Sequence, residues 1–343
     1  MFYGVPWFSL GHYPTPIAAI DVFGRTLWVK REGASHPAYG GNKIRTLEAW
    51  LGHARDVGAR RIWAIGAYGS NHAVATVVHA RAAGLDAGAL LFPQHASAWA
   101  AENASALIAS GAKLVRLRSV LEVPFVGAAI ARRRGEIVMP PGGATPIGAF
   151  GAMTAALELA DQVAAGALPA PRRVVLAIGS TCTTAGLLVG FAIARATGRW
   201  RGELPIVHGV RVTPWPITSR ATVLALALRT LARAVSRGAP ASARLGELVV
   251  DGRQLGRGYG VETARGERAA LAIESAGGPR CDGVYAGKAA AALLELHRRG
   301  DGPLLLWASK SEVVMPPASR EALAAAPRAL ARFATSSAES RRR

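Results

Sequence analysis

The most conspicuous reactive side chain in the sequence is Lys43, within Gly40-Gly41-Asn42-Lys43-Ile44-Arg45. The two glycines let the backbone pass close to another group. Lys43 begins an amphipathic helical pattern, where the positive end of the helix dipole disfavours its protonated form. A lysine with a lowered pKa suits Schiff-base chemistry. The alternative is a solvated surface lysine, although the whole chain has only five lysines.

Two polar loops lie where a strand pattern gives way to a helix pattern. Gly69-Ser70-Asn71-His72 follows a strand ending near Gly66, and Asn71 offers both a donor and an acceptor to a ligand. The loop Gly179-Ser180-Thr181-Cys182-Thr183-Thr184 precedes a helix, so its amides and hydroxyls suit a phosphate group. Simple helix capping is the alternative for both loops.

Together these three segments indicate a pyridoxal phosphate site between two α/β lobes. The sequence lacks the glycine-rich P-loop, the G-x-G-x-x-G dinucleotide motif, G-x-S-x-G and H-E-x-x-H. These absences argue against nucleotide hydrolysis, dinucleotide oxidoreduction, the hydrolase elbow and zinc-protease chemistry. We expect no metal site.

The elements that must position these loops alternate between apolar strand patterns and amphipathic helix patterns, which predicts an α/β fold of mostly parallel sheets flanked by helices. Strands are expected at 61–66, 87–92, 113–117, 136–139, 173–178, 206–212, 247–250 and 304–307. Helices are expected at 47–58, 72–83, 98–110, 120–134, 147–165, 185–196, 217–236, 263–276 and 287–299.

Two lobes follow from this alternation and from the turn-rich Pro140-Pro141-Gly142-Gly143. We assign 46–143 to a small lobe, and 1–45 with 144–333 to a large lobe that binds the cofactor. The first forty residues are interpreted as an arm rather than a separate domain. The Ser-rich and Arg-rich tail, 334–343, is expected to be disordered.

The composition excludes several classes of protein. The 343 residues carry a formal charge of +19, yet the arginines are spread along the chain and the basic runs lack interleaved aromatic residues, so we expect no nucleic-acid partner. Neither a membrane span nor a signal peptide is indicated. Only two cysteines are present, Cys182 and Cys281, in keeping with a reducing compartment. The cytoplasm is therefore expected.

The sequence resembles a known family through segments that occur in its order. The first three are the Gly40–Arg45 and Gly69–Ala73 segments and Pro141-Gly142-Gly143. The others are Ala156-Leu157-Glu158-Leu159-Ala160, Thr184-Ala185-Gly186-Leu187-Leu188-Val189-Gly190 and Val284-Tyr285-Ala286-Gly287-Lys288-Ala289. The family is that of 1-aminocyclopropane-1-carboxylate (ACC) deaminase and D-cysteine desulfhydrase, fold-type II pyridoxal phosphate enzymes of the tryptophan synthase β-subunit type. The resemblance spans roughly 14–310.

The resemblance implies roles for individual residues. Lys43 would form the Schiff base with the cofactor and take the α-proton of the substrate. Asn71 would bond the phenolic oxygen of the cofactor, and Ser70 would face the substrate carboxylate or act in proton transfer. Tyr285 would lie over the substrate side of the ring. The loop from Gly179 to Thr184 would hold the phosphate, and Ser309 would face the pyridine nitrogen.

Three departures from the family pattern bear on the reaction. Thr181 and Cys182 stand where the family loop is glycine-rich, and Ala286 replaces the glutamate of ring-opening deaminases, which argues against ring opening. The segment around Trp307 differs from the usual His-Thr-Gly-Gly. We expect all three sites to lie near the bound ligand.

The resemblance favours β-elimination from a small amino acid, giving a 2-oxo acid and ammonia, with D-cysteine as the first substrate to test. It also implies a homodimer. The departures support an alternative, a diverged enzyme that acts on another amino acid by deamination, replacement or racemisation. A catalytically silent basic scaffold is a third hypothesis, motivated by the charge alone.

Overall fold

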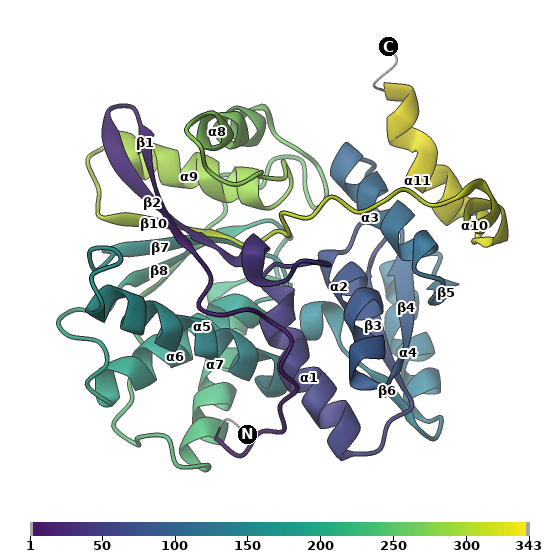
Figure 1. The fold of residues 1–343 in the computed structure, drawn as a ribbon, viewed down its shortest axis with the longest axis horizontal. Coiled ribbons are helices and arrows are strands. Elements are labelled where there is room, and N and C mark those ends of the chain that lie inside the picture. Colours follow the sequence, from purple (N-terminus) through teal and green to yellow (C-terminus); the bar gives the residue numbers. More distant parts are fainter. Residues whose placement is uncertain (1–2, 341–343) are drawn as a thin grey trace.

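The computed structural model describes residues 3–340 and contains two sheets. The larger has the order β1 (Ile17–Val22), β2 (Arg25–Arg31), β10 (Leu304–Ala308), β7 (Arg173–Ile178), β8 (Ile206–Arg211) and β9 (Leu248–Asp251). The smaller has the order β5 (Lys113–Arg116), β4 (Asp86–Phe92), β3 (Arg61–Ala67) and β6 (Glu136–Val138). All strand pairs are parallel except β1 with β2. Each sheet forms one of two lobes (Figure 1).

Helices cover both faces of the larger sheet. One face carries α5 (Pro146–Ala164), α6 (Cys182–Ala196) and α7 (Arg220–Val235), and the other carries α8 (Ala264–Ser275) and α9 (Ala286–Arg298). Side chains of a strand alternate between its two faces. On β7, Val174 and Leu176 therefore pack into the core with α5 and α6, whereas Val175 packs with α9.

The smaller sheet is enclosed in the same way. Helices α1 (Lys43–Asp56), α2 (Asn71–His79) and α3 (Ala98–Ala109) cover one face, and α4 (Val123–Ala131) covers the other. Helix α1 also connects the lobes, because Leu47 and Leu51 lie in the small-lobe core while Ala49 lies in the large-lobe core. The helix that begins at Lys43 is thus fixed from two sides.

The predicted α/β fold is confirmed, and each predicted strand and helix is present with its bounds shifted by a few residues. The arm holds more structure than expected, because β1 and β2 form a hairpin and β2 pairs with β10. Leu27 and Val29 of this hairpin are fully buried against the large-lobe core. This pairing joins segments at opposite ends of the chain, so the local pattern did not reveal it.

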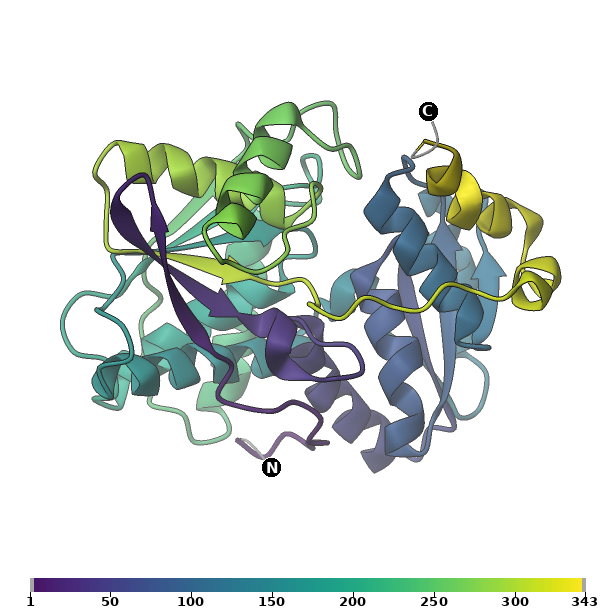
Figure 2. The ribbon, with the colours of Figure 1, turned by 45° about the horizontal axis from the view of Figure 1, so that its top comes forward.

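The structure corrects the C-terminal assignment in two respects: the tail is helical rather than disordered, and the last residues assigned to the large lobe pack on the small lobe. Helix α10 (Arg320–Ala325) precedes α11 (Arg328–Ser340), so 334–340 is helical rather than disordered, and 341–343 lies outside the described residues. The chain crosses from β10 to the small lobe, where both helices pack (Figure 2). The reason is amphipathicity: Leu330 is buried in the small-lobe core and the ring of Phe333 packs edge-on against Tyr68. Within 3–340, no helix combines the length and apolar character needed to span a membrane.

Candidate active site

A cavity of about 480 Å³ lies between the lobes and is lined by residues from both. It collects every site residue predicted from the sequence: Lys43, Ser70, Asn71, Gly179, Ser180, Thr181, Cys182, Thr183, Thr184, Tyr285 and Ser309. The physical reason is the topology. The carboxyl ends of parallel strands share one edge of a sheet, and these residues follow strands or begin the next helix. Their individual roles remain predictions.

Lys43 is the first residue of α1, and its Nζ lies in the cavity wall. The contacts of Nζ are long, 3.4 Å to both the Gly142 carbonyl oxygen and Ser180 Oγ. Burial lowers the pKa of Lys43 below its ordinary value, while nearby Cys182 opposes this shift. The backbone before Lys43 is tightly placed, since a Cβ on Gly41 would come within 2.7 Å of the Ser309 carbonyl oxygen. Lys43 is therefore a weakly bonded amine on a fixed backbone.

Asn71 is oriented by two neighbours that donate to the same oxygen. Its Oδ1 accepts hydrogen bonds from the Tyr39 hydroxyl at 3.0 Å and from Asn103 Nδ2 at 2.7 Å. The side-chain NH₂ of Asn71 is thus the group left to donate into the cavity. Ser70 caps α2 by accepting a bond from the Ala73 amide, so its predicted capping role is real and coexists with its place in the cavity wall.

The loop from Gly179 to Thr184 forms the N-terminal end of α6. Thr181 is the N-cap residue and makes no side-chain cap, so the first-turn amides have no side-chain acceptor among the described residues. Such an end suits an anion. Thr181 adopts a φ of 65°, a left-handed conformation that favours glycine, so the loop keeps a glycine-like backbone despite the threonine. Asn42 Nδ2 donates to Thr183 Oγ1 at 2.8 Å and ties this loop to the Lys43 segment.

Tyr285 faces the cavity together with Tyr259, a residue that the sequence analysis missed. Their hydroxyl oxygens are 2.7 Å apart. Burial raises the pKa of both phenols, so both remain protonated near neutral pH. Ser309 follows the end of β10 and also lines the cavity. Tyr259 lies in a turn-rich stretch with no motif around it, and only the tertiary fold brings it to Tyr285.

His72 is another cavity residue that was not singled out as a ligand, although it directly follows Asn71. Its side chain is buried, and neither ring nitrogen has a hydrogen-bond partner among the described residues. Burial, reinforced by the charge of Lys43, lowers the pKa of His72 to about 3. The imidazole is therefore neutral at physiological pH and adds no positive charge beside Lys43.

Two of the departures from the family pattern do not lie where we expected them. Thr181 and Cys182 line the cavity, but Ala286 and Trp307 are not among its lining residues. Trp307 is buried in the core with α5 and α6, and Ala286 is buried in the core with α8 and α9. Strand alternation turns the Trp307 ring into the core, whereas Ser309 follows the strand end and reaches the cavity.

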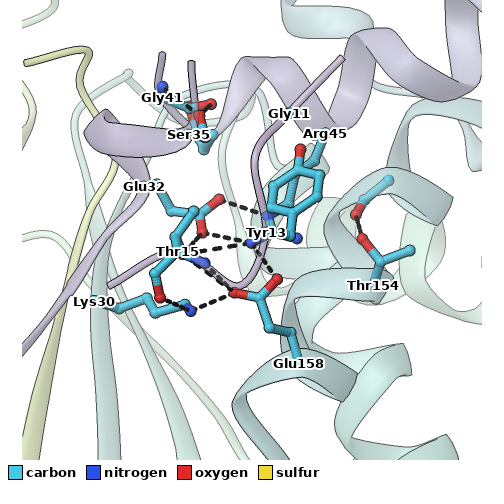
Figure 3. Close-up of polar contacts among 12 residues, drawn as sticks. Gly11, Tyr13, Thr15, Lys30, Glu32, Ser35, Gly41, Arg45, Thr154 and Glu158 are labelled. Atoms are coloured by element: carbon cyan, nitrogen blue, oxygen red, sulfur yellow. Dashed lines mark hydrogen bonds and ion pairs between the residues drawn. The ribbon is translucent and has the colours of Figure 1, made fainter. Parts of the chain in front are cut away.

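A buried cluster of charges anchors the helix that carries Lys43 (Figure 3). Arg45 donates from Nε and Nη2 to the Glu32 carboxylate at 2.7 and 2.9 Å, and from Nη2 to Glu158 Oε2 at 2.9 Å. Lys30 also pairs with Glu158. Burial alone would raise the pKa of Glu32, but Arg45 holds it below its ordinary value. The cluster joins β2, α1 and α5.

The donor set of the cavity fits pyridoxal phosphate. It offers an uncapped helix end for the phosphate, an amide donor for the phenolic oxygen and a weakly bonded lysine for the aldehyde. The model of the family described as pyridoxal-phosphate dependent enzymes matches residues 8–303. The chain belongs to this family. The predictions of the cofactor and of a fold-type II enzyme are thereby confirmed.

Individual relatives of this pyridoxal-phosphate dependent enzyme differ in their reactions. This chain is 35% identical over 305 residues to nocardicin C-9' epimerase of Nocardia uniformis subsp. tsuyamanensis. The alignment covers 86% of this chain and 89% of that protein. This chain is also 30% identical over 316 residues to D-cysteine desulfhydrase of Salmonella paratyphi C, and the alignment covers 85% of this chain and 90% of that protein. The solved structure of an ACC deaminase homologue superposes on this chain with a TM-score of 0.74 at 27% identity. The match covers 91% of this chain and 93% of that chain.

Proposed function

We propose that this enzyme removes the α-proton of an amino acid and then eliminates a substituent from Cβ, with D-cysteine as the first substrate to test. The observation that carries the proposal is the convergence of Lys43, Asn71 and the uncapped start of α6 on one cavity. The similarity to D-cysteine desulfhydrase supports elimination as the outcome. Pyridoxal phosphate, when bound, withdraws electrons from the bonds of Cα and makes the α-proton acidic.

The residues of the chain would divide the remaining work. The amides of Thr181, Thr183 and Thr184 would hold the phosphate, since the Cys182 amide already donates to the Ser180 carbonyl oxygen at 2.8 Å. The Asn71 amide would donate to the phenolic oxygen. Lys43 would take the α-proton, since a lowered pKa increases the fraction of neutral amine at any given pH. Ser70, at the N-terminal end of α2, would orient the substrate carboxylate.

Elimination from D-cysteine balances without an added oxidant or reductant. The Cα–H bond breaks and its electron pair forms the Cα–Cβ double bond, while the sulfur leaves with the Cβ–S bonding pair and takes up a proton. Addition of one water then yields pyruvate, ammonia and hydrogen sulfide. Tyr285 would supply a proton rather than accept one, because its phenol stays protonated.

Epimerisation is the second candidate, and the 35% identity to an epimerase favours it. It begins with the same removal of the α-proton but returns a proton to the opposite face of Cα. No leaving group is needed. The protonated Tyr259–Tyr285 pair gives the cavity a second proton donor besides Lys43.

The two candidates separate in one experiment with the holoenzyme. D-cysteine and a panel of D- and L-amino acids are incubated in heavy water, and sulfide, 2-oxo acid, α-deuteration and the enantiomer ratio are measured. Sulfide with pyruvate supports elimination, whereas deuteration with inversion and no sulfide supports epimerisation. Neither reaction with any amino acid, in protein that shows the near-visible absorption of the cofactor, would contradict both candidates.

Lys43→Ala tests the assigned base within the same assay. We expect loss of the near-visible Schiff-base absorption and loss of turnover by at least about a thousandfold, as for removal of an essential proton-transfer group. Lys113→Ala is the matched control, because Lys113 is an exposed lysine at the start of β5. Retained absorption and turnover in Lys43→Ala would show that another lysine serves the cofactor.

We also propose that the enzyme works in the cytoplasm, as a homodimer and without nucleic acid. The family resemblance supports the dimer, and the two free cysteines fit a reducing compartment. Sedimentation equilibrium of the purified holoenzyme measures the oligomeric state, and a monomer would contradict the dimer.

A further inference from the structure

The cavity changes in character from its inner to its outer part. Its inner wall contains buried polar residues, among them Ser70 and Thr184. The outer lining is mainly apolar and comes from both lobes: Phe92, Pro93, Val120, Pro214 and Ile217. We refer to these five residues as the apolar mouth.

Two residues of the apolar mouth are unusually exposed for apolar side chains. Val120 is 51% exposed and Ile217 is 59% exposed, although each also lines the cavity. Leu121, Phe125 and Trp215, close by in the sequence, are exposed as well. The described residues contain ten exposed large hydrophobic side chains. Five of them lie in two short segments, 120–125 and 215–217. Among these five, Val120 and Ile217 place exposed apolar side chains from the two lobes at one cavity, which is typical of a binding surface.

The two segments cannot be explained as one local feature of the chain. The segment 120–125 follows β5 in the small lobe, and 214–217 follows β8 in the large lobe. They approach the same cavity only in the folded protein. A group seated between them would contact apolar side chains of both lobes at once.

D-cysteine would make little use of this arrangement. Its side chain ends one atom beyond Cβ, and Cβ must stay near Lys43 for the α-proton to be removed. The mouth would then remain in contact with water. A longer apolar substituent would reach it and gain the free energy of burying apolar surface.

We infer that the substrate is an amino acid whose side chain carries an extended apolar group, preferably aromatic, that binds in the apolar mouth. The inference rests on the proposed function, which places Cα of the substrate near Lys43. Arg118, also exposed and part of the cavity lining, adds a cation that suits the face of an aromatic ring. The chemical class is therefore a small amino-acid core bearing an aryl or long alkyl substituent beyond Cβ.

S-Benzyl-D-cysteine and D-cysteine provide a matched pair of probes, because both carry sulfur on Cβ and differ in the apolar group. We measure kcat/KM for each with the holoenzyme, and the concentration at which each half-shifts the near-visible absorption band of the cofactor. The L-enantiomers are included. We expect the benzyl compound to be favoured by about tenfold or more in both measurements, the scale expected for burying an aromatic ring.

Variants of the mouth test whether this preference arises there. Val120→Ser and Ile217→Ser, one from each lobe, should each reduce the benzyl preference by about threefold or more. Leu228→Ser is the matched control, because Leu228 is an exposed apolar residue of α7 that is not among the cavity-lining residues. This control should retain the preference of the unchanged enzyme.

The remaining outcomes distinguish the inference from the proposed function. Tighter binding of S-benzyl-D-cysteine without any product would contradict elimination and still support the mouth. Equal or weaker binding of S-benzyl-D-cysteine, or a preference unchanged in both mouth variants, would overturn the inference. If the mouth instead covers a second copy of the chain, the serine variants would change the sedimentation behaviour and leave the preference intact, which also overturns it.

Discussion

At the scale of single residues, the reactivity of Lys43 follows from its surroundings. The positive end of α1 and the loss of water on burial both act against the ammonium form, and no carboxylate of the described residues contributes to the pKa shift of Lys43. The neighbouring His72 is neutral for the same reason, burial. The weak contacts of Nζ leave the amine free to react, and its backbone holds it at the cavity wall.

The pH dependence of cofactor binding should report this lowered pKa. Only the neutral amine attacks an aldehyde, so a lysine with a lowered pKa reaches its full rate at a lower pH. We expect the rate at which pyridoxal phosphate binds the apoenzyme to level off at a lower pH than its reaction with a lysine peptide, whose pKa is about 10.4. The growth of the near-visible band measures both rates. Coincident profiles would contradict a lowered pKa.

At the scale of elements, the start of α1 is held by a buried charge cluster. Two segments used to recognise the family, Gly40–Arg45 and Ala156–Ala160, meet through the contact between Arg45 and Glu158. The contact links their roles: one segment carries Lys43, and the other fixes the helix that begins with it. The arm takes part through Lys30 and Glu32 (Figure 3).

Arg45→Met should be strongly destabilising, because it leaves the Glu32 carboxylate buried without its guanidinium. We expect the free energy of unfolding to fall by about 3–5 kcal/mol, as when one partner of a buried ion pair is removed. Arg31→Met is the matched control, since Arg31 pairs with Glu312 while 36% exposed, and should lose no more than about 1 kcal/mol. Urea denaturation measures both, and similar losses would contradict the anchoring role.

The same cluster predicts a pH dependence of stability. Because Arg45 holds the pKa of Glu32 below its ordinary value, the folded carboxylate binds fewer protons than the unfolded one. The ionised Glu32 carboxylate contributes to stability above about pH 4.5, which is the ordinary pKa of a glutamate and applies in the unfolded chain. This contribution is lost as the pH falls through the lowered pKa. Urea titrations of the unchanged protein at decreasing pH measure this loss, and a constant stability down to pH 3 would contradict it.

At the scale of the whole molecule, the chain returns to the small lobe after completing the large one. The segment after β10 crosses between the lobes and ends in α10 and α11, which pack on the small lobe (Figure 1, Figure 2). The lobes are thus joined at α1 and again by this C-terminal segment. Both connections also contribute to the cavity between the lobes: Lys43 is the first residue of α1, and Ser309 begins the segment that follows β10.

Leu330→Ala tests this C-terminal connection. Leu330 is 1% exposed within the small-lobe core, so its truncation should lower the free energy of unfolding by roughly 2–5 kcal/mol. Thr335→Ala, at an exposed position of the same helix, should change it by less than about 0.5 kcal/mol. Denaturation midpoints measure the difference. Equal stability of the two variants would show that α11 packs too loosely to hold the lobe.

The local sequence determined most of the elements and the polar loops of the site. Hydrophobic periods of two and about 3.6 residues depend on near neighbours, so they predicted β3 and α5 closely. The strand-to-helix loops at Ser70 and Thr181 could be predicted as a converging site because parallel strands share a carboxyl edge.

Only the tertiary structure decided the features that depend on distant partners. These are the pairing of β2 with β10, the packing of α11, the orientation of Asn71 by Tyr39 and Asn103, and the approach of Val120 to the cavity lined by Ile217. The contacts themselves leave no periodic signal, because each partner lies far away along the chain. The amphipathic pattern of α11 indicates an apolar face but not the lobe on which that face packs. Local periodicity therefore determined which elements form, whereas long-range packing decided which side chains meet.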